Sequence, residues 1–224
     1  MAKYLKKFNS YPEYEAFIET SDFIKPNVSL CGQENEVYYN PYVDPYAGYE
    51  YVDLGLPSGT KWAKYNVGAN SETDYGNYYG YGKGAKTHQE TNGEPYYTGV
   101  ENPLAASVDT ATQTWGGMWH TPTMEQFSEL GRYTTYEWTT INGVNGGKFT
   151  AQNGNYVFFP AAGNFTGEAL WGMGQSSDFW TSTPDGNNKA YRFYVTNGDS
   201  DIWSIERSDL GTDEMGLSIR PVVG

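Results

Sequence analysis

Short stretches of alternating hydrophobic and polar residues run through this chain, the period expected of half-buried β-strands. Residues 191–195 alternate strictly, so we expect the odd-numbered side chains to face the core and Arg192 and Tyr194 to face outward. Residues 156–159 form a continuous buried run, and residues 217–223 are typical of a terminal strand. Turn dipeptides separate such segments at Asn153-Gly154, Asp185-Gly186 and Asn197-Gly198.

Helical periodicity is confined to two places, the first of them near the N-terminus. Ser10 is a favourable N-cap, Pro12 suits the first turn, and Glu13 completes a capping box before apolar residues at helical spacing. These signals predict a short amphipathic helix over about residues 11–20. The following residues are extended and tyrosine-rich, with prolines that block a helix. We therefore interpret residues 1–50 as an N-terminal arm or small subdomain.

The second helix is predicted in the middle of the chain. Thr121-Pro122 supplies the N-cap and first-turn proline, Phe127 and Leu130 share one face, and Gly131 is the expected stop. One or two helices against short antiparallel strands predict an α+β fold with long irregular loops over residues 51–224. The aromatic share of 17% and the many glycines agree with this α+β prediction, because they favour short strands and tight turns over a helical bundle.

Net charge and cysteine usage narrow the function classes. A formal charge of −13 disfavours nucleic acid and anionic membranes as partners, because both polyanions attract Lys and Arg. Cys31, the single cysteine, cannot form an intramolecular disulfide, so packing must hold the domain together. The N-terminus carries lysines but no apolar segment of signal-peptide length. We expect a chain made in the cytoplasm without a signal peptide, unless a leader has been trimmed.

Catalytic and metal chemistry find little support in the residue inventory. The sequence has only two histidines, His88 and His120. These are too few for a histidine-rich metal site and give little choice for the histidine of a Ser/His/Asp relay. Glu101-Asn102-Pro103 has the wrong order for a calcium-dependent sugar site, although a structural calcium in an acidic loop stays open. We predict no catalytic residue, no catalytic metal site and no cofactor.

Four sequence blocks resemble the C-type-lectin-like domains of gut bacteria that are related to the formylglycine-generating-enzyme fold. The blocks span roughly residues 51–224 in the family's order. They are Val52–Ala63 with Asn66–Ala69, Trp115–Thr123, Phe158–Gly163, and Phe179–Thr183 with Ser218–Val222. The resemblance implies a C-type-lectin-like fold.

The resemblance extends to the variable proteins of diversity-generating retroelements, in which adenine-directed mutagenesis rewrites the 3′ end of a gene. The substituted codons are often AAC or AAT, which cannot become Trp, Met, Gln, Lys or Glu. Arg192 and Tyr194 are reachable from such codons, whereas Trp180, Trp203 and Glu206 would be fixed or arise otherwise. This implies a ligand-binding surface near the C-terminus.

The candidate ligand-binding residues are aromatic, apolar and polar side chains of the last quarter of the chain, a mixture typical of paratopes. They are Trp171, Met173, Asp178, Phe179, Arg192, Tyr194, Ile202, Trp203, Ser204, Ile205, Arg207, Ser208 and Asp209.

The N-terminal arm, through Lys25–Cys31 and Val37–Pro41, is similar to leaders on structural proteins of phages that infect gut bacteria. The first hypothesis is therefore a non-enzymatic receptor-binding or adhesion protein of a phage or prophage. Its C-terminal surface would bind a host surface protein or glycan, and residues 1–50 would attach to a tail or mediate self-assembly into a homo-oligomer. The alternative is a lectin-like module of the bacterial surface with a fixed carbohydrate ligand. An enzyme of the formylglycine-generating type is the third possibility.

Overall fold

The structure, a computed structural model, describes residues 6–8, 28–30, 37–39, 46–91, 97–186, 189–206, 208–209 and 213–224. The chain divides into two compact units, Met1–Gly48 and Tyr49–Gly224. In the first unit, the strands β1 (Lys6–Phe8), β2 (Val28–Leu30) and β3 (Val37–Tyr39) form an antiparallel sheet in the order β1-β3-β2. The helix predicted over residues 11–20 lies outside the described residues.

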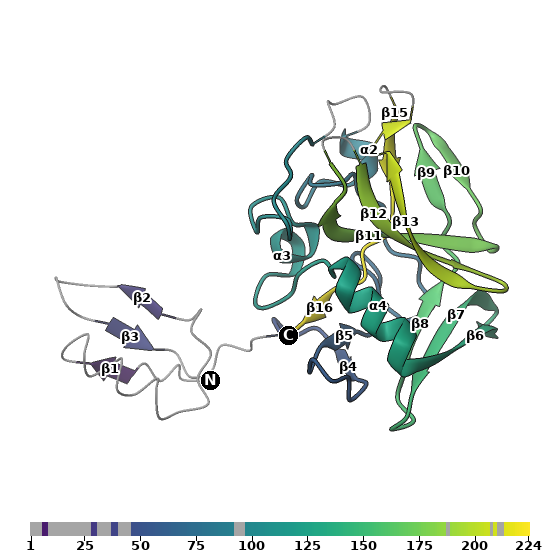
Figure 1. Cartoon of the computed structure of the whole chain (residues 1–224). Coiled ribbons are helices and arrows are strands. Elements are labelled where there is room, and N and C mark those ends of the chain that lie inside the picture. Colours follow the sequence, from purple (N-terminus) through teal and green to yellow (C-terminus); the bar gives the residue numbers. More distant parts are fainter. Residues whose placement is uncertain are drawn as a thin grey trace. The chain divides into compact units, whose positions relative to one another are not determined.

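The second unit carries four small antiparallel sheets in its described part (Figure 1). Their strand orders are β16-β5-β4, β6-β7-β8, β11-β12-β13 and β10-β9-β15-β14. The first sheet comprises β4 (Tyr51–Asp53), β5 (Lys61–Ala63) and β16 (Val222–Val223), and the second comprises β6 (Thr134–Ile141), β7 (Val144–Ala151) and β8 (Tyr156–Pro160). The third comprises β11 (Ser176–Pro184), β12 (Lys189–Thr196) and β13 (Ser200–Glu206). The fourth comprises β9 (Asn164–Thr166), β10 (Ala169–Trp171), β14 (Ser208–Asp209) and β15 (Asp213–Gly216).

Three helices complete the described part of this unit: α2 (His88–Thr91), α3 (Thr110–Trp115) and α4 (Met124–Tyr133). Helices and antiparallel strands therefore share the unit, which agrees with the α+β class expected from the sequence. The strands predicted around residues 156–159 and 191–195 correspond to β8 and β12, and all three turn dipeptides lie between strands.

Helix α4 begins two residues later than predicted, with Thr123 and not Thr121 as its N-cap, and it continues past Gly131 to Tyr133. Its N-cap is Thr123, whose side chain accepts from the Gln126 backbone N–H while the Gln126 side chain accepts from the Thr123 N–H. Thr121 is buried, and its N–H donates to the Asp109 carboxylate instead. Gly131 does not stop the helix, because its φ is not positive and it therefore does not adopt the left-handed conformation of a C-terminal cap. The backbone becomes extended at Thr134.

The C-terminal segment forms a strand over less of its length than predicted. Only Val222 and Val223 lie in a strand, β16, which pairs with β5. Leu217 and Ser218 instead make isolated bridges to Tyr79 and Phe179. The prediction of one strand over residues 217–223 was therefore wrong, because successive residues of this segment pair with different parts of the chain.

Phenylalanine rings at the centre of the C-terminal unit connect helix α4 to two sheets, β6-β7-β8 and β11-β12-β13. Phe127 of α4 stacks on Phe193 of β12 at 4.4 Å, and Phe159 of β8 meets Phe179 of β11 edge-on at 4.9 Å. Phe149 of β7 contacts both Phe159 and Phe193. Such tilted and edge-on pairs add about 0.5–1.5 kcal/mol each beyond simple burial. These rings fix how the sheet β11-β12-β13 sits on the rest of the unit.

Arg220 lies fully buried beside this aromatic cluster. Its Nε donates to Asn66 Oδ1 and one terminal nitrogen donates to the Phe158 carbonyl, both at 2.8 Å. The other terminal nitrogen lies 3.3 Å from the carbonyls of Ala63 and Lys64. The guanidinium also covers the Phe159 ring at 4.7 Å. Burial lowers the pKa of Arg220 to about 9, so the group remains cationic at neutral pH.

Replacement of Arg220 is expected to destabilise the C-terminal unit strongly. In Arg220→Ala, Asn66 and the Phe158 carbonyl lose their donor inside the protein, so the free energy of unfolding should fall by about 3–5 kcal/mol. Urea denaturation measures this. The control is Arg132→Ala at an exposed position of α4, for which the change should stay within about 0.5 kcal/mol. Equal effects of the two substitutions would contradict the role assigned to Arg220.

Candidate functional site

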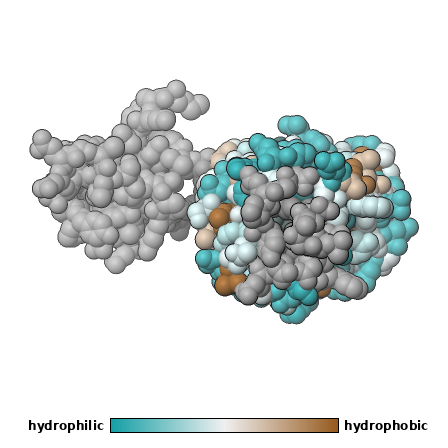
Figure 2. All heavy atoms as spheres, turned by 90° about the horizontal axis from the view of Figure 1, so that it is seen from above, coloured by the Kyte–Doolittle hydropathy of each residue, from teal (hydrophilic) through white to brown (hydrophobic). Residues whose placement is uncertain are grey.

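The hairpin of β9 and β10 leaves large apolar side chains in contact with solvent. The exposed fractions are 38% for Leu170, 61% for Trp171 and 53% for Met173. The other exposed large hydrophobic residues among those described are scattered along the chain at Tyr51, Val100, Met118 and Tyr133. Figure 2 shows one face of the molecule, on which the described residues are mostly hydrophilic and the hydrophobic ones form small separate spots. The apolar group on β10 and the loop after it is therefore the main candidate for a contact surface.

Glycines hold this hairpin in place. Gly167 adopts a φ of 57° in the two-residue turn between β9 and β10, a conformation that favours glycine. Gly163, just before β9, has a φ of 69°, and a Cβ atom there would lie 2.1 Å from the carbonyl oxygen of Trp171. The backbone around Trp171 can approach only because residue 163 has no side chain. The exposed hairpin is thus fixed by close backbone packing.

A buried ion pair connects the hairpin to the sheet β11-β12-β13. Asp178 of β11 is fully buried, and its carboxylate accepts from Arg192 of β12 and, at 2.7 Å, from the Asn164 side chain of β9. Burial raises the pKa of Asp178, while Arg192 and Asn164 lower it by stabilising the charge. Arg192 also lies over the Tyr194 ring at 5.0 Å. This places the partly exposed Arg192 and Tyr194 on the same part of the surface as the hairpin.

Two candidate residues do not belong to that surface, and a third is partly buried. Phe179 is fully buried against Phe159 in the core, and Asp178 is buried by its ion pair. Ile202 lies opposite Phe193 in the sheet register and packs against the hydrophobic core. The prediction that Asp178 and Phe179 face a ligand was wrong, whereas for Ile202 it stays a prediction. Both faces of β11 are covered, and Ile202 has the inward position of the alternating pattern.

The remaining candidates lie on β13, on β14 and between these two strands. The backbone register places Trp203 opposite Arg192, Ser204 opposite Tyr191 and Ile205 opposite Ala190. Ser208 and Asp209 form β14, which pairs with β15. Arg207 lies outside the described residues. For these positions the ligand-binding role stays a prediction.

Sequence reasoning missed Leu170 and Asn164 as members of the site. The available signal was the Gly167-Glu168 pair between two short alternating segments, which is typical of a two-residue hairpin. A hairpin prediction there would have placed Asn164 opposite Trp171, as the structure does. The exposure of all three residues of β10 could not have been predicted in this way, because a turn signal fixes the pairing and not the burial.

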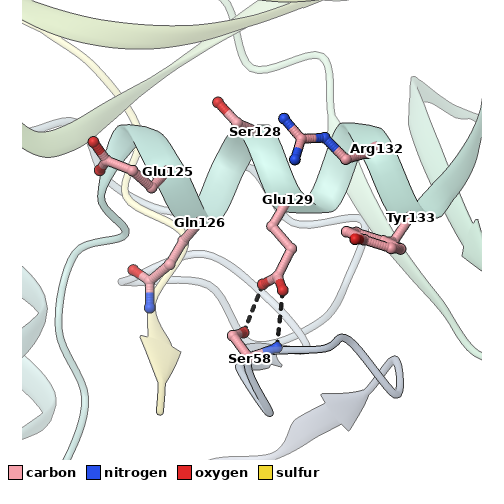
Figure 3. A pocket seen from close by; sticks show the side chains of 7 residues that line it. All are labelled: Ser58, Glu125, Gln126, Ser128, Glu129, Arg132 and Tyr133. Atoms are coloured by element: carbon pink, nitrogen blue, oxygen red, sulfur yellow. Dashed lines mark hydrogen bonds between the residues drawn. The ribbon is translucent and has the colours of Figure 1, made fainter.

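A hollow lies beside helix α4 and is lined by Ser58, Glu125, Gln126, Ser128, Glu129, Arg132 and Tyr133 (Figure 3). The Ser58 backbone N–H and hydroxyl donate to the Glu129 carboxylate at 2.9 and 2.6 Å, as the dashed lines in Figure 3 show. Glu129 thus holds the loop at Ser58 against the helix. The groove is open and shallow-sided, and the Glu129 carboxylate is already engaged by Ser58, so it is a weaker candidate for ligand binding than the hairpin.

Both histidine side chains contact residues that shape the fold. His88 is buried, with Nε2 2.7 Å from the Gly167 carbonyl oxygen in the hairpin turn. His120 Nε2 lies 3.4 Å from the side-chain nitrogen of Gln126, the residue that completes the capping box of α4. Among the described residues, no three His, Cys, Asp or Glu side chains cluster closely enough to hold a metal ion. In the same part of the chain, no helix combines the length and apolar character needed to cross a membrane.

No protein-family model, no curated protein and no solved structure matches this chain.

Two tyrosines that support the site predict how stability depends on alkaline pH. Tyr78 packs edge-on against Phe165 of β9 and donates to the Ala162 carbonyl, while Tyr136 donates to the Thr196 carbonyl at the end of β12. Burial raises the pKa of each to about 12 from an ordinary value of 10. The folded chain therefore keeps protons that the unfolded chain loses between pH 10 and 12, so stability should be complete below pH 10 and decline above it.

The expected loss is about 1–2 kcal/mol across this window, after allowance for partial exposure. Urea denaturation between pH 8 and 12 measures it, since those values bracket the ordinary and raised pKa values. The Tyr78→Phe/Tyr136→Phe double variant should show a flatter profile. Ionisation of both tyrosines at their ordinary pKa in the folded protein would contradict the prediction.

Proposed function

We propose that this chain is a non-enzymatic ligand-binding protein whose C-terminal unit, of C-type-lectin-like fold, carries the binding surface. The observation that carries the proposal is the exposed apolar group Leu170, Trp171 and Met173 on a hairpin that glycines fix in place. Burying one such side chain in an interface contributes about 1.5–3 kcal/mol. The rigid backbone reduces the ordering cost that a mobile loop would add on binding.

The proposed binding surface combines two kinds of residue. Trp171 and Met173 cannot arise from adenine substitution in AAC or AAT codons, so they are the constant apolar part. Arg192 and Tyr194 are reachable from such codons and are partly exposed, so they are the variable part. Tyr and Arg suit this role because they provide large contact areas and adaptable polar contacts.

We infer further that the protein is a receptor-binding or adhesion protein of a phage or prophage, diversified by a retroelement. Its ligand is a protein or glycan on the host cell surface, and the N-terminal unit attaches it to a tail or mediates self-assembly. The sequence blocks that resemble retroelement variable proteins and the phage-like N-terminal segment support this assignment. The separation of the chain into two compact units is compatible with one unit for attachment and one for binding.

The gene itself tests the diversification. Sequencing the 3′ end and the downstream region should find a near-copy of the codons for about residues 163–220 that differs at adenines, beside a reverse-transcriptase gene. Differences should affect codons of exposed residues such as Arg192 and Tyr194, and should spare those of the buried Asp178 and Phe179. Absence of both the near-copy and the reverse transcriptase would contradict diversification and favour a fixed-ligand adhesin, for which glycan-array binding is the next measurement.

Loss of the apolar hairpin side chains should weaken binding without unfolding the protein. Trp171→Ser/Met173→Ser removes two side chains that are more than half exposed, so the affinity for host cells should fall at least about tenfold while stability stays near wild type. Flow cytometry with the labelled protein measures the affinity. The matched control is Val100→Ser/Tyr133→Ser, at exposed fractions of 55% and 45% elsewhere on the unit. Equal loss in both variants would contradict a surface centred on the hairpin.

A further inference from the structure

Strand β10 forms an outer edge of its sheet. In the order β10-β9-β15-β14 its one neighbour within the described part of the chain is β9. Ala169, Leu170 and Trp171 are all exposed, so side chains on both faces of the strand contact solvent. A two-residue turn at Gly167-Glu168 connects β9 and β10. The strand therefore presents an edge and two faces that a partner could cover.

The backbone of Leu170 is the group that this edge offers. In a hairpin with a two-residue turn, the pair that flanks the turn exchanges hydrogen bonds, and here that pair is Thr166 and Ala169. Because hydrogen-bonded and non-hydrogen-bonded pairs alternate, Leu170 directs its N–H and C=O away from β9. Native edge strands are commonly protected by lysine, proline or a bulge, and β10 has none of these. The edge is thus chemically suited to accept another strand.

The charge around this edge favours a basic partner. Residues 164–178 and 192–201 contain four carboxylates, those of Glu168, Asp178, Asp199 and Asp201, and one cation, Arg192. Ser176 pairs with Thr196, so the loop after β10 and the turn that carries Asp199 lie at the same end of the sheet. Asp178 is already paired with Arg192, whereas Glu168, Asp199 and Asp201 are exposed. A basic segment would meet opposite charge here.

The same charge argues against a second copy of this chain at the edge. Each chain has a formal net charge of −13, so two copies repel one another when these acidic ends approach. A flat glycan would stack on Trp171 but would leave the Leu170 backbone groups and the other face of the strand uncovered. An extended polypeptide covers the edge and both faces, because its side chains alternate in the same way as those of β10.

We propose that the partner of this surface is a protein that adds an extended, Lys- or Arg-containing segment as a strand along the free edge of β10. This inference rests on the proposed binding function and names its partner class. The backbone of Leu170 forms the main-chain hydrogen bonds, Trp171 and Met173 contact apolar side chains of the segment, and Glu168, Asp199 and Asp201 attract its basic ones. A pairing of only three residues gives modest affinity at one site, which several copies on one particle would increase.

The probe is a fluorescein-labelled peptide of alternating lysine and valine, measured by fluorescence anisotropy with the full chain. It should bind at least about tenfold more tightly than the alternating glutamate and valine peptide, and rising salt should weaken it. Leu170→Pro removes the outward N–H and should lose most of the binding, whereas the matched variant Leu170→Thr keeps that N–H and should retain it. Equal binding of the two peptides, or full binding by folded Leu170→Pro, would overturn the proposal.

Amide hydrogen exchange of the wild-type chain tests the edge without a substitution. Addition of the lysine and valine peptide should slow exchange at the Leu170 amide at least about tenfold, and should leave the Val100 amide unchanged. Binding without protection of Leu170 would show a purely electrostatic contact and would overturn strand addition. Protection that depends on protein concentration alone would show self-pairing, which also overturns it. If the peptide does not bind to the wild-type chain while the Trp171→Ser/Met173→Ser variant still binds host cells more weakly than the wild type, the strand-addition proposal fails and the binding function stands.

Discussion

The burial of Arg220 is the constraint on which the C-terminal unit depends. A guanidinium without solvent contact must satisfy its donors inside the protein, and here all four acceptors are neutral oxygens. Those oxygens belong to the end of β5 with the segment after it and to β8, so one side chain near the C-terminus fixes the positions of two distant parts of the chain. Arg220 also covers Phe159, which contacts Phe127, Phe179 and Phe193. The sheet that carries Arg192 and Tyr194 is positioned through these rings.

Arg192, unlike Arg220, is partly exposed and pairs with a carboxylate. It pairs with the buried Asp178 yet keeps part of its side chain exposed, so the ion pair joins the interior to the surface. Through Asn164 the same carboxylate reaches the hairpin of β9 and β10. The exposed apolar residues of β10 are therefore connected to the rigid core by a polar cluster on one side and by the close approach at Gly163 on the other. This connection explains how a small hairpin can present Trp171 to solvent in a fixed place.

The sequence predicted those elements whose local pattern agrees with their burial. In β12, Phe193 and Val195 are buried as expected whereas Tyr191 is only partly buried, and β8 is a continuous apolar run inside the core. Strand β11 shows where such reasoning stops: residues 176–183 are all buried although most are Ser, Thr or Asp. Other segments cover both of its faces. Thr181 donates to the Tyr191 carbonyl of the neighbouring strand β12, whereas the buried hydroxyls of Ser177 and Ser182 have no hydrogen-bond partner among the described residues. No local pattern reveals such coverage, so Asp178 and Phe179 were wrongly placed at the surface. Trp171, one of the candidates, is exposed, but its neighbours in the hairpin depend on a cross-strand register that periodicity alone does not give.

The most direct test of a binding surface centred on β10 and β12 is a scan of all single substitutions under two selections, one for protease resistance and one for binding to host cells. Protease resistance reports folding, so positions that lose binding but keep resistance identify the contact surface. The account predicts that these positions cluster at Leu170, Trp171, Met173, Arg192 and Tyr194, and that substitutions at Arg220 and Phe179 fail both selections. A cluster along the α4 groove at Glu125 and Arg132, or binding losses that always follow folding losses, would contradict it.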